Sequence, residues 1–196
     1  MNDPVGASQP NDKKKALLRV GNFNIGIVQD MLESKNQEKW LAKFEQVVQT
    51  LVSEGHLDLL SLCEVGGHKQ GFAQAQIDPQ DLGVFQQHRR VKVEQNYLST
   101  WGHRRDDASQ LLHLQHSDVH TLAGSVFLQA QLVIQLYSIQ NELVLIHGNL
   151  HIRTPNEKKV SVTTKKRLLL EALQKLDAAR DSFATKVPAI LLGDCN

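Results

Sequence analysis

Hydrophobic and polar residues follow two different periods along this chain, and these periods predict strands and helices in turn. The apolar stretch from Ala16 to Ile27 is predicted as a strand, and Leu57 to Val65 as a strand buried on both faces. Between them, from about Ser34 to Gly55, apolar residues recur at helical spacing, which predicts an amphipathic helix. Because a helix connects the two strands, parallel pairing through a right-handed crossover is the expected arrangement.

The second half of the chain predicts a hairpin, a helix and a last strand. Leu122 to Ser138 and Glu142 to Ile152 are predicted as consecutive strands joined by a turn at Gln140-Asn141. A polar loop from Asn156 to Thr164 precedes a helix predicted from Lys165 to Phe183. The core face of that helix is expected to carry Leu169, Leu173, Leu176 and Ala179. The apolar run Ala189 to Leu192 predicts a fully buried strand that ends in a turn at Gly193.

The middle of the chain, from Gly66 to Arg105, is the hardest part to interpret. Only Val84-Phe85 and Val91 to Tyr97 suggest short strands there. A basic group in this region would suit a phosphate backbone or simply be solvated surface: His88, Arg89, Arg90, Lys92, His103, Arg104 and Arg105. His113, His116 and His120 would share a face if they lay on a helix and would then suit Zn²⁺, but no fourth ligand is evident.

Composition is typical of one soluble globular domain. The chain has 196 residues, of which 41% are hydrophobic and 22% charged, and a net charge of +1, which favours no particular partner. Cys63 and Cys195 form no disulfide framework, so we expect a reducing intracellular compartment, cytoplasm or nucleus. No apolar run is long enough to span a membrane, and oligomeric state is not indicated. Polar residues 1–15 are expected to be a disordered lead-in to a domain over residues 16–196.

Polar side chains stand where the predicted strands end. Asn24 ends the first strand and Glu64 the second, and Asn149 with His151 ends the hairpin. Asp194 and Asn196 follow the last strand, two residues apart. Each of these residue types is also ordinary at a strand end or a turn. Together, amide and carboxylate oxygens at one sheet edge would suit Mg²⁺ and a water held against phosphorus.

This ordered series resembles the endonuclease/exonuclease/phosphatase family, the metal-dependent phosphodiesterases that include deoxyribonuclease I and exonuclease III. The resemblance rests on four segments and covers most of the chain from residue 17 onward: Leu18-Arg-Val-Gly-Asn-Phe-Asn24, Asp58-Leu-Leu-Ser-Leu-Cys-Glu64, Leu143 to His151, and Leu191-Leu-Gly-Asp-Cys-Asn196. It implies a four-layered α/β sandwich of the deoxyribonuclease I-like type, with two packed sheets between helices and a site along one edge.

The resemblance also implies roles for individual residues. Glu64 would bind Mg²⁺ or Mn²⁺ with help from Asn24. His151 would contact the phosphate, with Asn149 in that role if the register is one strand pleat off. Asp194 would orient or deprotonate the attacking water, and Asn196 would position Asp194 and a phosphate oxygen. The cations expected to bind the substrate phosphates are Arg153, Lys165 and Arg167.

Three departures from the family pattern bear on activity. Cys63 stands where many members have Gln, and Gly26 stands where some carry an acid. The Ser-Asp-His type motif that follows Gly-Asp-x-Asn in the family has no counterpart before the sequence ends. We therefore expect a chain that is truncated and lacks the C-terminal strands of the sandwich.

Three functions remain open on the sequence. The first is metal-dependent hydrolysis of a phosphoester by activated water, with nucleic acid favoured as substrate over a phosphoinositide or phospholipid headgroup. The second is an inactive, truncated remnant that binds nucleic acid or a protein partner. The third is an unrelated α/β binding domain. Magnesium-dependent turnover that is lost on Glu64→Gln would separate the first from the other two.

Overall fold

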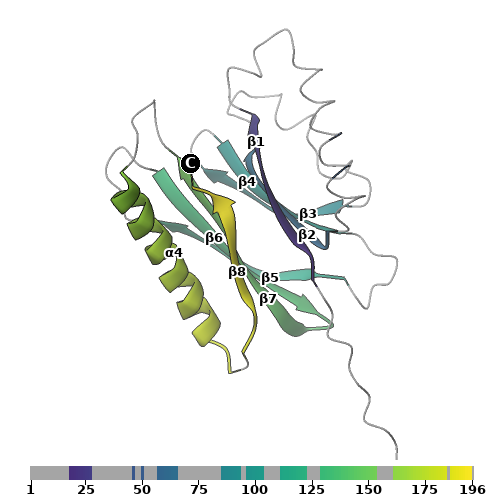
Figure 1. Ribbon diagram of the computed structural model, residues 1–196. Helices are drawn as coiled ribbons and strands as arrows, with labels where there is room; N and C mark the ends of the chain where they lie inside the picture. The colour runs from purple at the N-terminus through teal and green to yellow at the C-terminus, as the bar shows by residue number, and fades with distance from the viewer. Residues whose placement is uncertain are drawn as a thin grey trace, which may run out of the picture.

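The computed structural model describes residues 18–27, 46, 50, 57–65, 85–93, 96–103, 111–122, 129–153, 161–184 and 186–195. Its strands form two four-stranded sheets. The first contains, in spatial order, β1 (Val20–Ile27), β2 (Leu59–Val65), β4 (Asn96–His103) and β3 (Phe85–Val93). The second contains β5 (His113–Thr121), β6 (Gln129–Ile139), β7 (Glu142–Arg153) and β8 (Ala189–Asp194), and helix α4 (Val162–Asp181) packs against it (Figure 1).

The second sheet is the middle layer of the described part, because its two faces have different partners. Along β6 and β7, successive side chains point to opposite faces of the sheet. One face carries Leu132 and Leu150, which form a core with Leu168 and Leu176 of α4. The opposite face carries Tyr137 and Leu145, which cluster with Leu59 of β2 and so hold the two sheets together. The described layers are therefore helix, sheet and sheet.

The predicted pairing of the first two strands is confirmed. β1 runs parallel to β2, in a register that places Val20 beside Leu59 and Asn24 beside Cys63. Of the helix predicted between them, only Gln46 and Thr50 are described, and both are helical and exposed. The predicted lead-in over residues 1–15 lies outside the described residues.

The predicted hairpin between β6 and β7 is also confirmed. Its turn residues Gln140 and Asn141 have φ angles of 50° and 65°. Positive φ at both central residues is the type I′ geometry, whose twist matches that of antiparallel strands. Asn tolerates this conformation better than most side chains because its amide bonds to nearby backbone.

The middle of the chain forms more strand than the sequence indicated. Residues expected to give short strands form the antiparallel pair β3 and β4, and β4 also pairs with β2. The segment with the three histidines is strand β5, so the zinc hypothesis for them is wrong. Along a strand, His116 lies roughly 10 Å from His113 and roughly 13 Å from His120, so the three side chains are spread too far to share one ion. His116 instead pairs with Asp118, at 2.8 Å.

Helix α4 begins earlier than predicted, and only part of its predicted core face is buried: Leu176 is buried and Ala179 packs against the core. It starts at Val162, three residues before the predicted Lys165, because Ser161 caps it by accepting a hydrogen bond of 3.2 Å from the Thr164 amide. Its buried residues are Leu168, Ala172 and Leu176. The predicted core residues Leu169 and Leu173 are instead 38% and 41% exposed.

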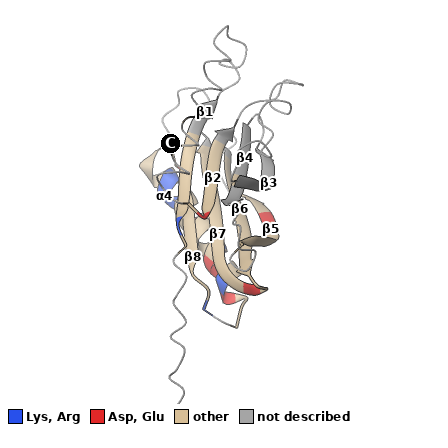
Figure 2. Cartoon of the chain, turned by 90° about the vertical axis from the view of Figure 1, so that its right-hand side faces the viewer, with Lys and Arg blue, Asp and Glu red and all other residues tan. Residues whose placement is uncertain are grey.

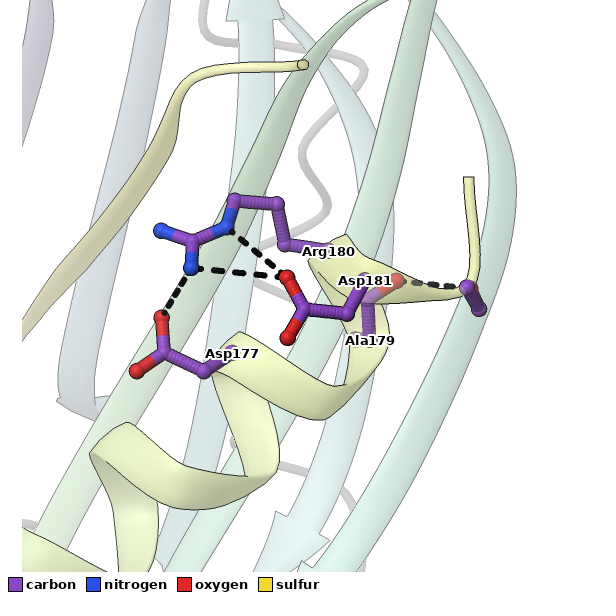
Figure 3. Close-up of polar contacts among 5 residues, drawn as sticks. Asp177, Ala179, Arg180 and Asp181 are labelled. Atoms are coloured by element: carbon purple, nitrogen blue, oxygen red, sulfur yellow. Dashed lines mark hydrogen bonds and ion pairs between the residues drawn. The ribbon is translucent and has the colours of Figure 1, made fainter. Parts of the chain in front are cut away.

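The C-terminal end of α4 is fixed by polar contacts (Figure 3). Arg180 pairs with Asp177 at 3.1 Å and with Asp181 at 3.4 Å. Ser182 donates its hydroxyl to the Ala179 carbonyl at 2.7 Å. A cation in the last turn also suits the negative end of the helix dipole.

Strand β8 is present but partly exposed, whereas a fully buried strand was expected. It stands at the end of its sheet in the described part and pairs with β7 alone. Gly193 belongs to this strand and has a φ of 155°. A Cβ atom there would lie 1.9 Å from the Leu150 carbonyl oxygen, so the close approach of β8 to β7 requires glycine.

Among the residues that the structure describes, no helix combines the length and the apolar composition needed to cross a lipid bilayer.

Candidate active site at the carboxyl ends of the strands

A hydrogen bond joins β1 of the first sheet to β8 of the second, near the carboxyl ends of the two strands. The Asn24 side-chain amide, near the end of β1, donates to the carboxylate of Asp194, the last residue of β8. These residues are 170 positions apart in the sequence, and both are partly exposed. β1 and β8 are the end strands of their sheets in the described part, and they lie side by side (Figure 1). An amide and a carboxylate predicted from separate motifs thus share one place.

His151 belongs to the same group. β7 and β8 run parallel, and their register places His151 directly beside Asp194. The His151 side chain is 1% exposed, so the protein packs around it and fixes its position. The structure therefore brings together Asn24, His151 and Asp194 from three strands.

Asn149 lies one pleat deeper on the same face of β7, and a small polar cluster surrounds it. Its Oδ1 accepts a hydrogen bond of 3.4 Å from Asn22 Nδ2, and the Cys63 thiol donates to the same oxygen at 3.6 Å. Its Nδ2 is buried and makes no hydrogen bond to any residue in the described ranges. A buried donor left in this state costs about 1 to 3 kcal/mol.

A second buried network lies another pleat deeper, between the two sheets. Ser61 Oγ is 2.9 Å from His147 Nε2, and His147 Nδ1 is 3.3 Å from Gln135 Oε1. Gln135 Nε2 in turn donates to Thr100 Oγ1 at 2.7 Å. Because a carbonyl oxygen only accepts, Nδ1 carries a proton, and in the neutral imidazole Nε2 then accepts from Ser61. Burial lowers the pKa of His147 to about 4, in agreement with that state.

Positive charge borders the Asn24–Asp194 pair on the side of α4. Burial raises the pKa of the Cys195 thiol, the Asp194 carboxylate raises this pKa further, and the Lys165 ammonium opposes both. Lys165 in the first turn of α4 is therefore close enough to act on the residues that end β8. The first turn contains no acidic residue, and Figure 2 shows basic residues of α4 beside the C-terminal end of the chain.

Some predicted site residues are placed only in part. Glu64 and Arg153 belong to β2 and β7, but their side chains lie outside what the structure describes. Asn196 lies outside it altogether. Arg167 is exposed on α4. The backbone of Glu64 follows Cys63, the register partner of Asn24, and so lies at the same sheet edge.

The donor atoms at this edge fit a hard divalent cation. The Asp194 carboxylate and the amide of Asn24 supply oxygen atoms, which Mg²⁺ and Mn²⁺ prefer over nitrogen and sulfur. Within the described residues, no group of three or more His, Cys, Asp and Glu side chains is arranged to hold a metal ion. Mg²⁺ sites commonly combine few protein ligands with water and substrate.

An open cavity lined by described residues lies elsewhere. It has a volume of about 820 Å³ and lies between the end of α4 and the start of β8, against Arg180, Phe183 and Lys186. Asp194 ends β8, so this cavity and the Asn24–Asp194 pair are at opposite ends of that strand. The Arg180 guanidinium is already paired with two carboxylates, so we assign the cavity no chemistry.

Sequence reasoning missed the polar residues beneath the site. The sequence assigned no role to Asn22, Ser61 or His147. The available signal was alternation, because Asn22 precedes Asn24 by two positions, and His147 and Asn149 precede His151 by four and two. Polar residues at every second position of otherwise apolar strands indicate a polar inner face.

Comparisons with solved structures identify the fold. The chain is similar to humanized D. rerio TDP2, with a TM-score of 0.55 at 15% identity over 91% of this chain and 66% of that one. It is similar to ANGEL2, a 2',3'-cyclic phosphatase, with a TM-score of 0.60 at 16% identity over 90% and 52%. An endonuclease/exonuclease/phosphatase from Beutenbergia cavernae gives a TM-score of 0.52 at 17% identity over 90% and 46%.

These likenesses show an endonuclease/exonuclease/phosphatase-like fold, as the sequence resemblance predicted. The mixed sheets with few helices agree with it. No family model and no curated protein matches the sequence itself. The chain spans between 46% and 66% of the lengths of these three structures.

Proposed function

We propose that this protein hydrolyses a phosphoester by means of an activated water, at the edge where the two sheets meet. The observation that supports this most strongly is the contact between Asn24 and Asp194, with His151 beside them in register. A carboxylate, an amide and an imidazole held together by three strands provide a base, a hydrogen-bond donor and a phosphate contact. The names of two structurally similar proteins, a 2',3'-cyclic phosphatase and an endonuclease/exonuclease/phosphatase, agree with phosphoester hydrolysis.

The geometry suggests a role for each of these side chains. Asp194 is the base that orients the attacking water and accepts its proton, because a carboxylate only accepts hydrogen bonds. Asn24 holds that carboxylate in one orientation through its amide. His151, buried beside Asp194, contacts a phosphate oxygen. Asn196 remains assigned to positioning Asp194 and the phosphate, as the motif implies.

We further propose that Glu64 and Asn24 hold Mg²⁺ or Mn²⁺. When bound, the ion would neutralise the charge that develops on the phosphate, which is usually a large contribution to such catalysis. The protein residues would meanwhile orient the water and keep the phosphate between the two sheets. Removing the ion with EDTA should abolish turnover, and Mg²⁺ or Mn²⁺ should restore it.

Nucleic acid is the substrate class we favour over a phospholipid headgroup. Lys165 lies near Asp194 at the start of α4, and Arg167 and Arg153 are placed on elements that reach the same edge. Several cations near one edge of the protein suit the repeated phosphates of a nucleic acid. One similar structure holds ANGEL2 with adenosine-2',3'-vanadate, a nucleoside bearing a phosphate mimic.

Two further parts of the family pattern belong to this proposal. One is the four-layered sandwich, which requires a helix outside the first sheet in addition to α4 outside the second. The other is a reducing intracellular compartment, with which buried Cys63 and exposed Cys195 agree, since neither forms a disulfide within the described residues.

The test is turnover with substrates of three kinds. Bis(p-nitrophenyl) phosphate, a single-stranded oligonucleotide and phosphoinositide vesicles would each be assayed with Mg²⁺. Hydrolysis by the parent protein should fall about 10²- to 10⁴-fold on Asp194→Asn, because a general base is lost. The matched control is Asp118→Asn, which removes an exposed carboxylate on β5 and should change nothing.

The outcome also separates the proposal from a binding remnant. If the oligonucleotide binds but no substrate is cleaved by the folded protein at any Mg²⁺ or Mn²⁺ concentration, the chain is a binding module. If turnover survives Asp194→Asn unchanged, the assignment of the base is wrong. Preference for the vesicles over the oligonucleotide would overturn the substrate class alone.

A further inference from the structure

A single amide beneath the candidate site is held in one orientation by two donors. Asn149 is 1% exposed and points to the same side of β7 as His151, two residues later. Its Oδ1 faces Asn22 Nδ2 at 3.4 Å and the Cys63 thiol at 3.6 Å. Asn22 Nδ2 also lies 3.9 Å from Cys63 Sγ, so the three side chains form one cluster from three strands.

The two donors decide which end of the amide is available. A flipped Asn149 would place its own NH₂ group against the NH₂ of Asn22 and the thiol hydrogen of Cys63. Donors facing donors repel, so with Asn22 and Cys63 oriented as they are, the observed orientation of Asn149 is the favoured one. The NH₂ group is consequently turned away from the cluster, and it makes no hydrogen bond to any residue within the described ranges.

A buried donor without a protein partner usually meets a water or a ligand. Asn149 lies one pleat below His151 and Asp194, which our proposed function places against the phosphate. The backbones of Asn149 and His151 are therefore about 7 Å apart along the strand. Two side chains at this spacing on one face can reach the same ligand.

We propose that Asn149 donates to a phosphate oxygen of the substrate, and that Asn22 and Cys63 are positioning residues that turn its amide for this purpose. The inference rests on the proposed function. It adds a preorganised donor to the Asn24–Asp194 pair and assigns roles to two residues of the strand-end segments, Asn22 and Cys63, to which the sequence assigned none. Preorganised donors help because they need no reorganisation as charge develops.

The decisive variant is Asn22→Asp, which keeps the size of the side chain and replaces its donor by an acceptor. The Asn149 amide should then turn over, so that its NH₂ group bonds to the introduced carboxylate and its carbonyl oxygen faces the phosphate. Cys63→Ser keeps a donor to Asn149 and is the conservative control. Cys63→Ala removes one of the two donors without adding a charge, and it serves if Asn22→Asp fails to fold.

The measurement is a titration with inorganic phosphate in the presence of Mg²⁺, followed by NMR of the side-chain NH₂ groups. In the parent protein and in Cys63→Ser, the Asn149 and Asn24 signals should shift together. In Asn22→Asp, the Asn149 signal should already be shifted without phosphate and should no longer respond. Turnover should fall about 10²-fold through kcat, as it does when one transition-state donor is lost.

Each remaining outcome has a clear meaning. If Asn24 responds to phosphate and Asn149 does not, the inference is overturned and the proposed function stands. If neither responds, both are overturned. If Asn22→Asp and Cys63→Ala both fold and both leave kcat and the Asn149 response unchanged, Asn22 and Cys63 have no positioning role.

Discussion

Three polar side chains of β7 point from one sheet toward the other, and each has a partner that matches its chemistry. His147 meets Ser61, Asn149 meets Cys63 and Asn22, and His151 stands in register with Asp194. Polar side chains therefore occupy this face of β7 from the buried interior to the edge where the strand ends. Because a buried polar group without a partner is costly, such a ladder needs a partner at every level, and the Asn149 NH₂ group is a donor for which the described residues supply none.

The deepest level predicts how stability depends on pH. The pKa of His147 is about 4 in the folded protein, below the ordinary value of 6.5 that applies to an unfolded chain. Below pH 6.5 the unfolded state therefore binds more protons, and stability is lost as pH falls from about 6.5 toward 4. At roughly 1.4 kcal/mol per pH unit of pKa difference, this loss amounts to about 3 kcal/mol.

Denaturant unfolding at pH 7 and at pH 4.5 measures that loss. His147→Gln is the matched variant, because its amide can still bond to Ser61 and Gln135 but does not titrate. The variant should lose less free energy of unfolding than the parent over this interval. Equal losses in the two proteins would show that His147 is not protonated on unfolding.

At the scale of elements, the sequence predicted strands more reliably than the faces they expose. The apolar runs of β1, β2, β6, β7 and β8 were sufficient to locate them. In α4, three consecutive leucines, Leu168 to Leu170, made the helical phase ambiguous by one residue, and the first two predicted core residues, Leu169 and Leu173, were each one position too late. β8 reads as buried because its residues are apolar, although it stands at the end of its sheet in the described part.

Neighbouring leucines on α4 allow the phase to be tested. Leu168 is fully buried against the second sheet, whereas Leu169 is 38% exposed. Leu168→Ala should cost about 2 to 5 kcal/mol of unfolding free energy because it leaves a cavity, and Leu169→Ala should cost well under half as much. Chemical denaturation of both variants measures the difference. Equal costs would mean that the helix packs in the predicted phase.

Gly193 permits a second test at this scale. Any side chain there would meet the Leu150 carbonyl oxygen, so Gly193→Ala must push β8 away from β7. We expect Asp194 to leave its position beside His151 and turnover to fall at least about tenfold, while α4 keeps its helical signal. Circular dichroism and the phosphodiester assay report these separately. Full activity in the variant would show that the β7–β8 register does not matter to the site.

At the scale of the whole molecule, the fold joins segments from both ends of the chain. Asn24 and Asp194 are 170 residues apart, and no local pattern indicates that they touch. The sequence placed both at strand ends, and the resemblance to a known family supplied their proximity. It did not reveal Asn22, because its contact with Asn149 depends on how the two sheets face each other. Alternation along one strand indicates which face of the strand is polar, but not which residue of the opposite sheet that face meets.

We propose that one divalent ion lies where the carboxyl ends of β1 and β2 meet those of β7 and β8. Paramagnetic broadening by a stoichiometric amount of Mn²⁺ in the NMR spectrum tests it most directly, since the effect reaches only nearby nuclei. We predict that the backbone amides of Asn24, Glu64, His151 and Asp194 broaden together and recover when Mg²⁺ is added in excess. Broadening confined to one sheet, or centred on another part of the molecule, would contradict the account.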